Sequence, residues 1–310
     1  MISISYVDRF LRGGLALAVV AACLFLSGCD VGSDGESGAE ASPTPPTLAC
    51  ILQSLPATQA EKYQGSMMSW APDGSALAYV TPTEDEQWCI GDLAVTAAPA
   101  FDTTLHIADW ATGNLVWSPN GQQIAFTGLR RTDSVYTIAV VDANGSGKVT
   151  DLFPGSLALT DEWSSPKKVV QWLSEGLLEV NASCGSTCMD TYQVNTNGAQ
   201  PASTGQNFSK AIWVPPVETP AADFQSSEEM LIPDWSPSGS EVVYLDSSGD
   251  LKLLQTRGGN KPLTIAVPSP LDINTDTTWA IETQWWQDQW LAVRVEGQIL
   301  IYDAACLRSQ

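Results

Sequence analysis

The chain has 310 residues, and its 14 Lys and Arg against 35 Asp and Glu give a formal net charge of −21 at pH 7. Such an acidic surface repels DNA, RNA and anionic lipid headgroups, so nucleic acid is excluded as an expected partner. The length is sufficient for one large domain with a substantial core.

The N-terminal segment has the pattern of an export signal. Arg9 and Arg12 precede an apolar stretch from Leu15 to Leu26, which is shorter than a typical membrane-spanning helix. The stretch ends in Leu26-Ser27-Gly28-Cys29, which resembles a bacterial lipoprotein signal box. We therefore expect cleavage after residues 1–28 and acyl chains such as palmitate on Cys29, holding the protein on the extracytoplasmic face of the cell membrane. An ordinary secretory signal and an uncleaved anchor are the alternatives.

Residues 29–48 are typical of a flexible tether, because they are rich in Gly, Ser, Glu, Asp, Thr and Pro and almost lack large apolar side chains. A coil of this length reaches about 25 Å. Without residues 1–28, which contain Arg9, Arg12 and Asp8, the chain keeps 12 basic and 34 acidic residues and a net charge of −22. The predicted folded domain spans residues 49–310.

A five-residue phrase then recurs in this domain. Its copies are Trp70-Ala71-Pro72-Asp73-Gly74, Trp117-Ser118-Pro119-Asn120-Gly121 and Trp235-Ser236-Pro237-Ser238-Gly239. Pro fixes its own φ and the residues that follow tolerate positive φ, so each phrase predicts a tight turn. Alternating apolar residues follow each copy, as in a half-buried strand. The Trp before the turn is large enough to fill the space between two packed sheets.

Two weaker copies of the phrase begin at Trp172 and Trp285, and the second lacks both Pro and Gly, so its turn must differ. The spacings between the five Trp residues are 47, 55, 63 and 50 residues. Turn-forming pairs such as Asn144-Gly145 predict a further hairpin in the second half of the unit. Four strands per repeat of this length are typical of a propeller blade.

These phrases resemble the WD40-like repeats of the TolB-type β-propeller family, over residues 50–310. The resemblance implies an all-β propeller built of four-stranded antiparallel blades. The Trp positions favour five blades, because the 25 residues after Trp285 and the 22 between Leu48 and Trp70 together complete one more period. Six blades, the usual number in the family, and a β-sandwich are the alternatives. A long insertion near residues 203–232 accounts for the widest spacing.

The cysteines are consistent with export to an oxidising compartment. A strand that begins at Cys50 can complete the last blade beside Ile299–Asp303, and a disulfide from Cys50 to Cys306 would then lock the ring. Cys184 and Cys188 predict a second, local disulfide, with free thiols or a metal as alternatives. Cys89 is left over and competes for either Cys50 or Cys306.

The sequence contains few residues that indicate catalysis. The single histidine, His106, lies in an alternating segment and is expected on a half-exposed strand face. No Gly-x-Ser-x-Gly elbow is present. Some five-bladed propellers are glycoside hydrolases with acidic residues at the central funnel, so that activity is the alternative function. The candidate acids are Asp85, Glu86, Asp161, Glu162, Glu228, Glu229, Asp234 and Glu282. Seven further tryptophans are expected to pack in the core or to stack on sugar rings: Trp88, Trp110, Trp163, Trp213, Trp279, Trp286 and Trp290.

Two acidic segments are candidates for a calcium loop. Asp272–Asp276 resembles the start of one, but Thr277 and Thr283 stand where an EF-hand requires Gly and Glu. Asp246–Asp250 is better interpreted as a hairpin turn. We expect no cofactor and no metal.

These patterns together predict a monomeric, lipid-anchored, extracytoplasmic β-propeller that acts as a non-catalytic binding or scaffold module. TolB-type propellers dock to cell-envelope partners, and the resemblance implies a role of the same class, with an envelope protein or a glycan as the partner. The chain departs from that family in its lipid signal and in lacking an N-terminal α/β domain.

Overall fold

A computed structural model describes residues 46–58, 66–83, 91–130, 135–146, 148–152, 168–185, 188–197, 202–209, 230–256, 261–267 and 281–310. The chain divides into Met1–Pro43 and Thr44–Gln310, and every described residue belongs to the second part. The predicted signal peptide, Cys29 and Cys89 lie outside the described residues.

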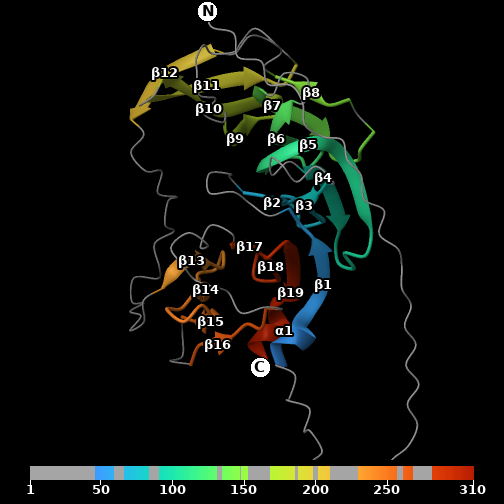
Figure 1. Cartoon of the computed structure of the whole chain (residues 1–310), viewed down its shortest axis with the longest axis vertical. Coiled ribbons are helices and arrows are strands. Elements are labelled where there is room, and N and C mark those ends of the chain that lie inside the picture. The colour runs from blue at the N-terminus through green and yellow to red at the C-terminus, as the bar shows by residue number, and fades with distance from the viewer. Residues whose placement is uncertain are drawn as a thin grey trace, which may run out of the picture. The chain divides into compact units, whose positions relative to one another are not determined.

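The described residues contain 19 β-strands, one 3-10 turn and one short helix (Figure 1). Blade 1 consists of β2 (Met68–Trp70), β3 (Ala76–Pro82), β4 (Gly91–Ala97) and the first half of β5 (Thr104–Trp117). Blade 2 takes the second half of β5, then β6 (Gln123–Arg130), β7 (Val135–Asp142) and β8 (Thr150–Asp151). Blade 3 is β9 (Lys168–Ser174), β10 (Leu177–Gly185), β11 (Cys188–Asn195) and β12 (Ala202–Ser209).

Blade 4 is β13 (Leu231–Trp235), β14 (Glu241–Leu245), β15 (Leu251–Gln255) and β16 (Leu263–Thr264). Blade 5 is β17 (Glu282–Trp286), β18 (Trp290–Val295) and β19 (Gln298–Asp303), completed by β1 (Ile51–Pro56). All pairings are antiparallel. The predicted β-propeller of four-stranded antiparallel sheets is therefore confirmed, and the described strands fall into five such units.

The joint between the chain ends is the one that the sequence predicts. Strand β1 pairs with β19, with Leu55 opposite Ile299, and the blue and red strands lie together in Figure 1. A disulfide joins Cys50 to Cys306 across a Cα–Cα distance of 5.4 Å. The helix α1 (Ala304–Arg308) follows β19, and its Arg308 guanidinium pairs with the buried Glu241 carboxylate of blade 4 at 2.6 Å.

The folded part begins earlier than residue 49. A 3-10 turn, η1 (Pro46–Cys50), precedes β1, and Thr47 within it is only 1 % exposed. Its hydroxyl accepts a hydrogen bond from the Ala266 backbone N–H at 2.9 Å, beyond the last strand of blade 4. Residues 46–48 of the predicted tether are therefore part of the fold, because this polar side chain finds its partner in the domain.

The repeated phrases form the predicted turns. Gly74, Gly121 and Gly239 have φ values of +70°, +69° and +66°, and each backbone N–H bonds to the carbonyl three residues earlier at 2.8–2.9 Å. In the copy without Gly the turn differs, as predicted: Gln289 N–H still bonds to the carbonyl three residues earlier, at 3.2 Å, but the positive φ of +47° falls on Gln287, the third residue of the phrase. The position that takes a left-handed φ therefore moves where the phrase lacks the Gly that favours it.

Hydrophobic clusters join neighbouring blades. Among the described residues, separate clusters link blade 1 with 2, blade 2 with 3, blade 4 with 5, and blade 5 with 1. The second strands of blades are consequently buried on both faces: every residue of β14 and β18 is buried. The sequence predicts half-buried strands, and β18 differs because its blade packs against blade 4 on one face and against blade 1 on the other.

The joint between blades 5 and 1 is aromatic. The Trp290 ring stacks on Trp70 at 5.8 Å and on Trp286 at 5.1 Å, and it meets the edge of Phe101 at 5.3 Å. Trp286 and Trp290 therefore pack against other aromatic rings of the joint, which is the first of their two predicted roles, core packing and stacking on sugar rings. Trp88, Trp163, Trp213 and Trp279 and the side chain of Trp110 lie outside the described part of the chain.

We expect Gly74→Ala to lower the free energy of unfolding by about 1–3 kcal/mol. The position has a left-handed φ, and an added Cβ would lie 1.9 Å from the Trp286 ring. Gly239→Ala is the matched control, because its φ is similar but no atom lies within 4 Å of the new Cβ. Urea unfolding of both variants measures the difference. Equal losses in the free energy of unfolding would show that the Trp286 ring moves aside at no energetic cost.

Candidate functional site

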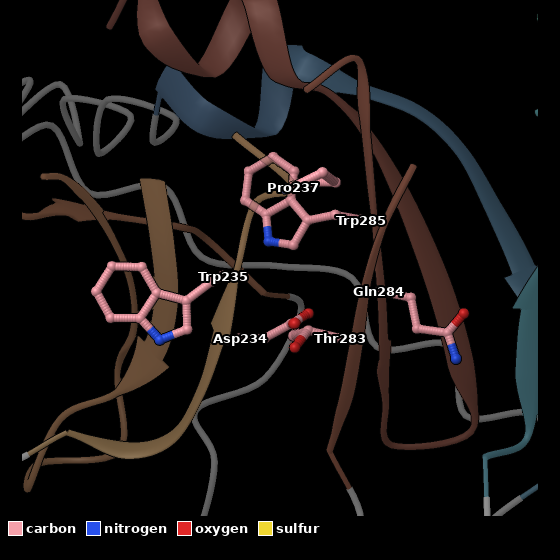
Figure 2. A pocket seen from close by; sticks show the side chains of 6 residues that line it. All are labelled: Asp234, Trp235, Pro237, Thr283, Gln284 and Trp285. Atoms are coloured by element: carbon pink, nitrogen blue, oxygen red, sulfur yellow. The ribbon is translucent and has the colours of Figure 1, made fainter. Parts of the chain in front are cut away.

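A cavity of about 350 Å³ lies between the first strands of blades 4 and 5. Asp234, Trp235 and Pro237 line it from β13 and the turn that follows, and Thr283, Gln284 and Trp285 line it from β17 (Figure 2). Figure 2 shows the Asp234 and Thr283 side chains pointing toward one another and the Gln284 side chain pointing away from them. Two of the repeated tryptophans therefore meet a carboxylate and a hydroxyl in one cavity.

The repeated tryptophans also form a series of hydrogen bonds between blades. The indole Nε1 of Trp117 donates to the Ser69 carbonyl at 2.9 Å, that of Trp172 to Val116 at 3.1 Å, and that of Trp70 to Gln284 at 3.3 Å. Each acceptor is the residue directly before the repeated Trp of the preceding blade. The bond from Trp70 to Gln284 follows the same rule and links blade 1 to blade 5, the last blade of the chain. The series therefore continues across the joint between the two ends of the folded chain.

Trp285 breaks the series. The rule would direct its Nε1 to the carbonyl of Asp234, yet among the described residues this buried nitrogen has no hydrogen-bond partner. A buried donor without an acceptor costs about 1–3 kcal/mol. Asp234 and Trp285, the two residues that the missing bond would join, both line the cavity.

Strand β13, on the blade 4 side of the cavity, contains an unusual backbone. Ile232 has a φ of +46°, and the pairing of β13 with β14 gains one extra residue between Leu231 and Asp234. A comparable bulge precedes Trp117, where Asn114 has a φ of +51°. Asn tolerates this conformation whereas a β-branched residue does not, so blade 4 stores strain next to the cavity.

The polar network on the other side of β17 is structural. The Glu282 carboxylate pairs with Arg294 Nε at 3.2 Å and accepts the Met67 backbone N–H at 2.9 Å, and it also accepts the Ser66 hydroxyl. Gln284 donates to the Met68 carbonyl at 2.7 Å. These bonds fix blade 5 to blade 1.

The candidate acids of a hydrolase are only partly described. Asp234 lines the cavity, while Glu282 is engaged by Arg294 and does not line it. The remaining six acids lie outside the described residues: Asp85, Glu86, Asp161, Glu162, Glu228 and Glu229. The described part of the cavity thus holds one carboxylate, where a glycoside hydrolase requires two.

His106 lies on the exposed face of β5, as expected. Its Nε2 is 3.1 Å from an Asp109 carboxylate oxygen and 3.6 Å from one of Asp92, and ligand atoms of all three lie within 4.8 Å of one another. The extra residue in β5 opposite Leu93 brings His106 and Asp109 to one face. The exposed imidazole thus lies close to both carboxylates.

The segment Asp246–Asp250 forms the predicted hairpin turn. Asp246 Oδ1 accepts the backbone N–H of Ser248 at 2.9 Å and that of Asp250 at 3.0 Å, while Lys252 Nζ lies 3.3 Å from Oδ2. Burial alone would raise the pKa of Asp246, but these hydrogen bonds outweigh it and lower the pKa to about 2. The other calcium-like segment, Asp272–Asp276, lies outside the described residues.

We expect Asp246→Asn to weaken the pH dependence of stability between about pH 4 and pH 2. The folded-state pKa is depressed, so the carboxylate contributes stability above its ordinary value, and this contribution is lost as pH falls toward about 2. Unfolding temperatures measured from pH 5 to pH 2 test this. Glu296→Gln, at an exposed carboxylate in the turn between β18 and β19, is the control, and equal slopes for the two variants would contradict the assignment.

The second cysteine pair lies on neighbouring strands. Cys184 is on β10 and Cys188 begins β11, with Gly185 opposite Cys188 across the hairpin. The side chains of both cysteines lie outside the described part of the structure, so their disulfide stays a prediction. No helix within the described residues has the length and apolar character needed to cross a membrane.

Comparisons with known proteins add little to this picture. The sequence matches no protein-family model and no curated protein. Among solved structures, the chain is similar to "Crystal Structure of Mitotic Checkpoint Complex", with 12 % identity and a TM-score of 0.34 over 92 % of this chain and 73 % of that one. "AtxE2 Isopeptidase - APO" has 13 % identity and a TM-score of 0.34 over 86 % of this chain and 47 % of that one. The β-propeller domain of the Trilobed protease from Pyrococcus furiosus has 13 % identity and a TM-score of 0.32 over 77 % and 68 %. At such low similarity the fold assignment rests on the sheet topology described above.

Proposed function

We propose that this chain is a lipid-anchored, extracytoplasmic β-propeller that binds a partner in the cell envelope and catalyses no reaction. The observation that carries the binding role is the cavity between β13 and β17. The residues that line it include a hydrogen-bond acceptor, Asp234, from blade 4 and a donor without a partner among the described residues, Trp285, from blade 5. Rigid strands hold these groups, which suits recognition of a ligand. The anchoring part rests on the sequence Leu26-Ser27-Gly28-Cys29.

Anchoring is tested by expressing the full chain and its Cys29→Ser variant in a bacterium that processes lipoproteins. We expect the wild type in the membrane fraction, with an intact mass that corresponds to a chain starting at Cys29 plus its acyl groups. The Cys29→Ser variant should lose both the acyl mass and the membrane association. A wild-type mass without acyl groups would refute the anchor while leaving the propeller and its cavity untouched.

Partner binding is tested by crosslinking in native membranes followed by mass spectrometry. We expect a stoichiometric envelope partner whose crosslinks fall on the faces of blades 4 and 5 near the cavity. Trp117→Phe, which removes an indole N–H from another blade joint, is a control that should retain the same crosslinks. The absence of any specific partner or ligand for the membrane-bound chain would contradict the proposal.

Glycoside hydrolysis is the second candidate, and one observation favours it: Asp234 places a carboxylate in the cavity. A screen of aryl furanosides and pyranosides with the wild type decides between the two. Turnover that disappears in Asp234→Asn would establish an enzyme, whereas binding without turnover supports the module.

A further inference from the structure

The structure assigns a ligand class to the cavity between β13 and β17: we infer that it binds a neutral sugar residue of a glycan. This inference rests on the binding role proposed above and names the chemistry of its ligand. Three features carry it, namely the Trp285 indole N–H that lacks an acceptor, the carboxylate and hydroxyl across the cavity, and the apolar rings beside them.

The Trp285 donor defines the first requirement on the ligand. The corresponding nitrogens of Trp70, Trp117 and Trp172 all reach a carbonyl of the preceding blade, at 3.3, 2.9 and 3.1 Å. At Trp285 that carbonyl is not reached, and the buried nitrogen is left with no partner among the described residues. Buried donors are almost always paired, so a ligand oxygen in the cavity is the natural acceptor.

The other lining groups define the second requirement. Asp234 offers carboxylate oxygens that accept hydrogen bonds, and Thr283 offers a hydroxyl that both donates and accepts (Figure 2). A ligand hydroxyl can accept from Trp285 and donate to Asp234, which a carbonyl oxygen alone cannot do. The carboxylate in the cavity and the formal net charge of −21 both disfavour an anion.

The third requirement is an apolar face. Trp235, Trp285 and Pro237, whose side chains carry indole and pyrrolidine rings, are among the residues that line the cavity. A sugar ring presents hydroxyls at its edge and C–H groups on its faces, so one molecule satisfies all the groups. The volume of about 350 Å³ lies at the small end of ligand sites, which suits one or two sugar units.

The experiment uses the full chain in a detergent without a sugar headgroup. Neutral oligosaccharides of two to four hexose or N-acetylhexosamine units are added one by one, and binding is measured by saturation-transfer NMR and calorimetric titration. We expect at least one to bind, and Trp285→Phe, which keeps an aromatic ring but removes the N–H, to weaken it by about 10-fold. Trp117→Phe, at a joint remote in sequence from the cavity, should bind as the wild type does.

Thermal unfolding of the same variants without ligand gives an independent readout. Trp117→Phe removes a satisfied hydrogen bond and should lower the unfolding temperature, whereas Trp285→Phe removes an unsatisfied donor and should leave it unchanged or raise it. If Trp285→Phe is as destabilising as Trp117→Phe, the nitrogen has a protein partner and the inference is overturned.

Two further outcomes would also overturn it. No oligosaccharide binds the wild type, or Trp285→Phe binds the same oligosaccharide equally well. If crosslinking in membranes still recovers a protein partner in either case, the binding role stands and only the ligand class is wrong. If neither glycan nor protein binds, the proposed function fails as well.

Discussion

Replacing Cys50 and Cys306 together by Ser is expected to lower the free energy of unfolding by about 5 kcal/mol. The disulfide closes a loop with a sequence separation of 256 residues, so its loss frees almost the whole folded chain in the denatured state. In the native state it ties the start of β1 to α1, at the only place where the first and last parts of the described chain share a sheet. Urea unfolding of the membrane-free domain under oxidising conditions measures the loss.

The control for this prediction is Cys89→Ser. Cys89 is the remaining cysteine that could have paired with either partner, and its replacement should leave stability unchanged if the Cys50–Cys306 bond is the one that forms. Peptide mapping before and after reduction identifies the bond directly. A loss below about 1 kcal/mol in the double Ser variant would show that β1, through its pairing with β19, holds the joint without covalent help.

The turns and the chain closure could be predicted because they depend on local chemistry and on counting. Pro and Gly at fixed places in the phrase determine the turn at Gly74, Gly121 and Gly239, and the Trp spacing fixes the number of units that the described strands show. The long strand β5 could not be predicted in this way. It serves blades 1 and 2 in turn, and the irregular pairing near Gly113 and Asn114 becomes visible only in three dimensions.

The candidate site was predicted less well than the fold. The sequence indicates a packing role for the repeated Trp residues, and the structure adds a hydrogen-bonding role that depends on where the preceding blade lies. No sequence signal distinguishes Trp285 from the others in this respect. Asp234 was one of eight candidate acids, and only the placement of β13 against β17 brings it into a cavity. In each such bond the indole N–H of a repeated Trp donates to the backbone carbonyl of the residue directly before the repeated Trp of the preceding blade. This pattern is a signal that could be sought in related repeats.

Replacing Glu282 by Gln is expected to lower the free energy of unfolding by about 3–5 kcal/mol. Arg294, which is only 4 % exposed, would lose the carboxylate that neutralises it and would stay buried with an uncompensated charge. Gln has the same shape, so the effect reports the charge and not a cavity. The loss should fall on the joint between blades 5 and 1, because Glu282 also accepts the Met67 backbone N–H.

Two controls separate the buried charge from a general loss of ion pairs. Asp250→Asn removes an exposed partner of Lys252 and should cost at most about 1 kcal/mol. The double variant Glu282→Gln with Arg294→Met removes both buried charges but keeps an oxygen for the Met67 N–H, and it should recover most of the stability lost in Glu282→Gln, because no charge is left without its partner. Amide hydrogen exchange of Met67 locates the effect: its N–H should exchange faster in Glu282→Gln than in Asp250→Asn, since only the first change weakens its acceptor. Equal exchange rates, or a Glu282→Gln loss no larger than that of Asp250→Asn, would mean that water reaches Arg294 and that the other contacts between the two blades, such as the stacking of Trp70 on Trp290, hold the joint without this ion pair.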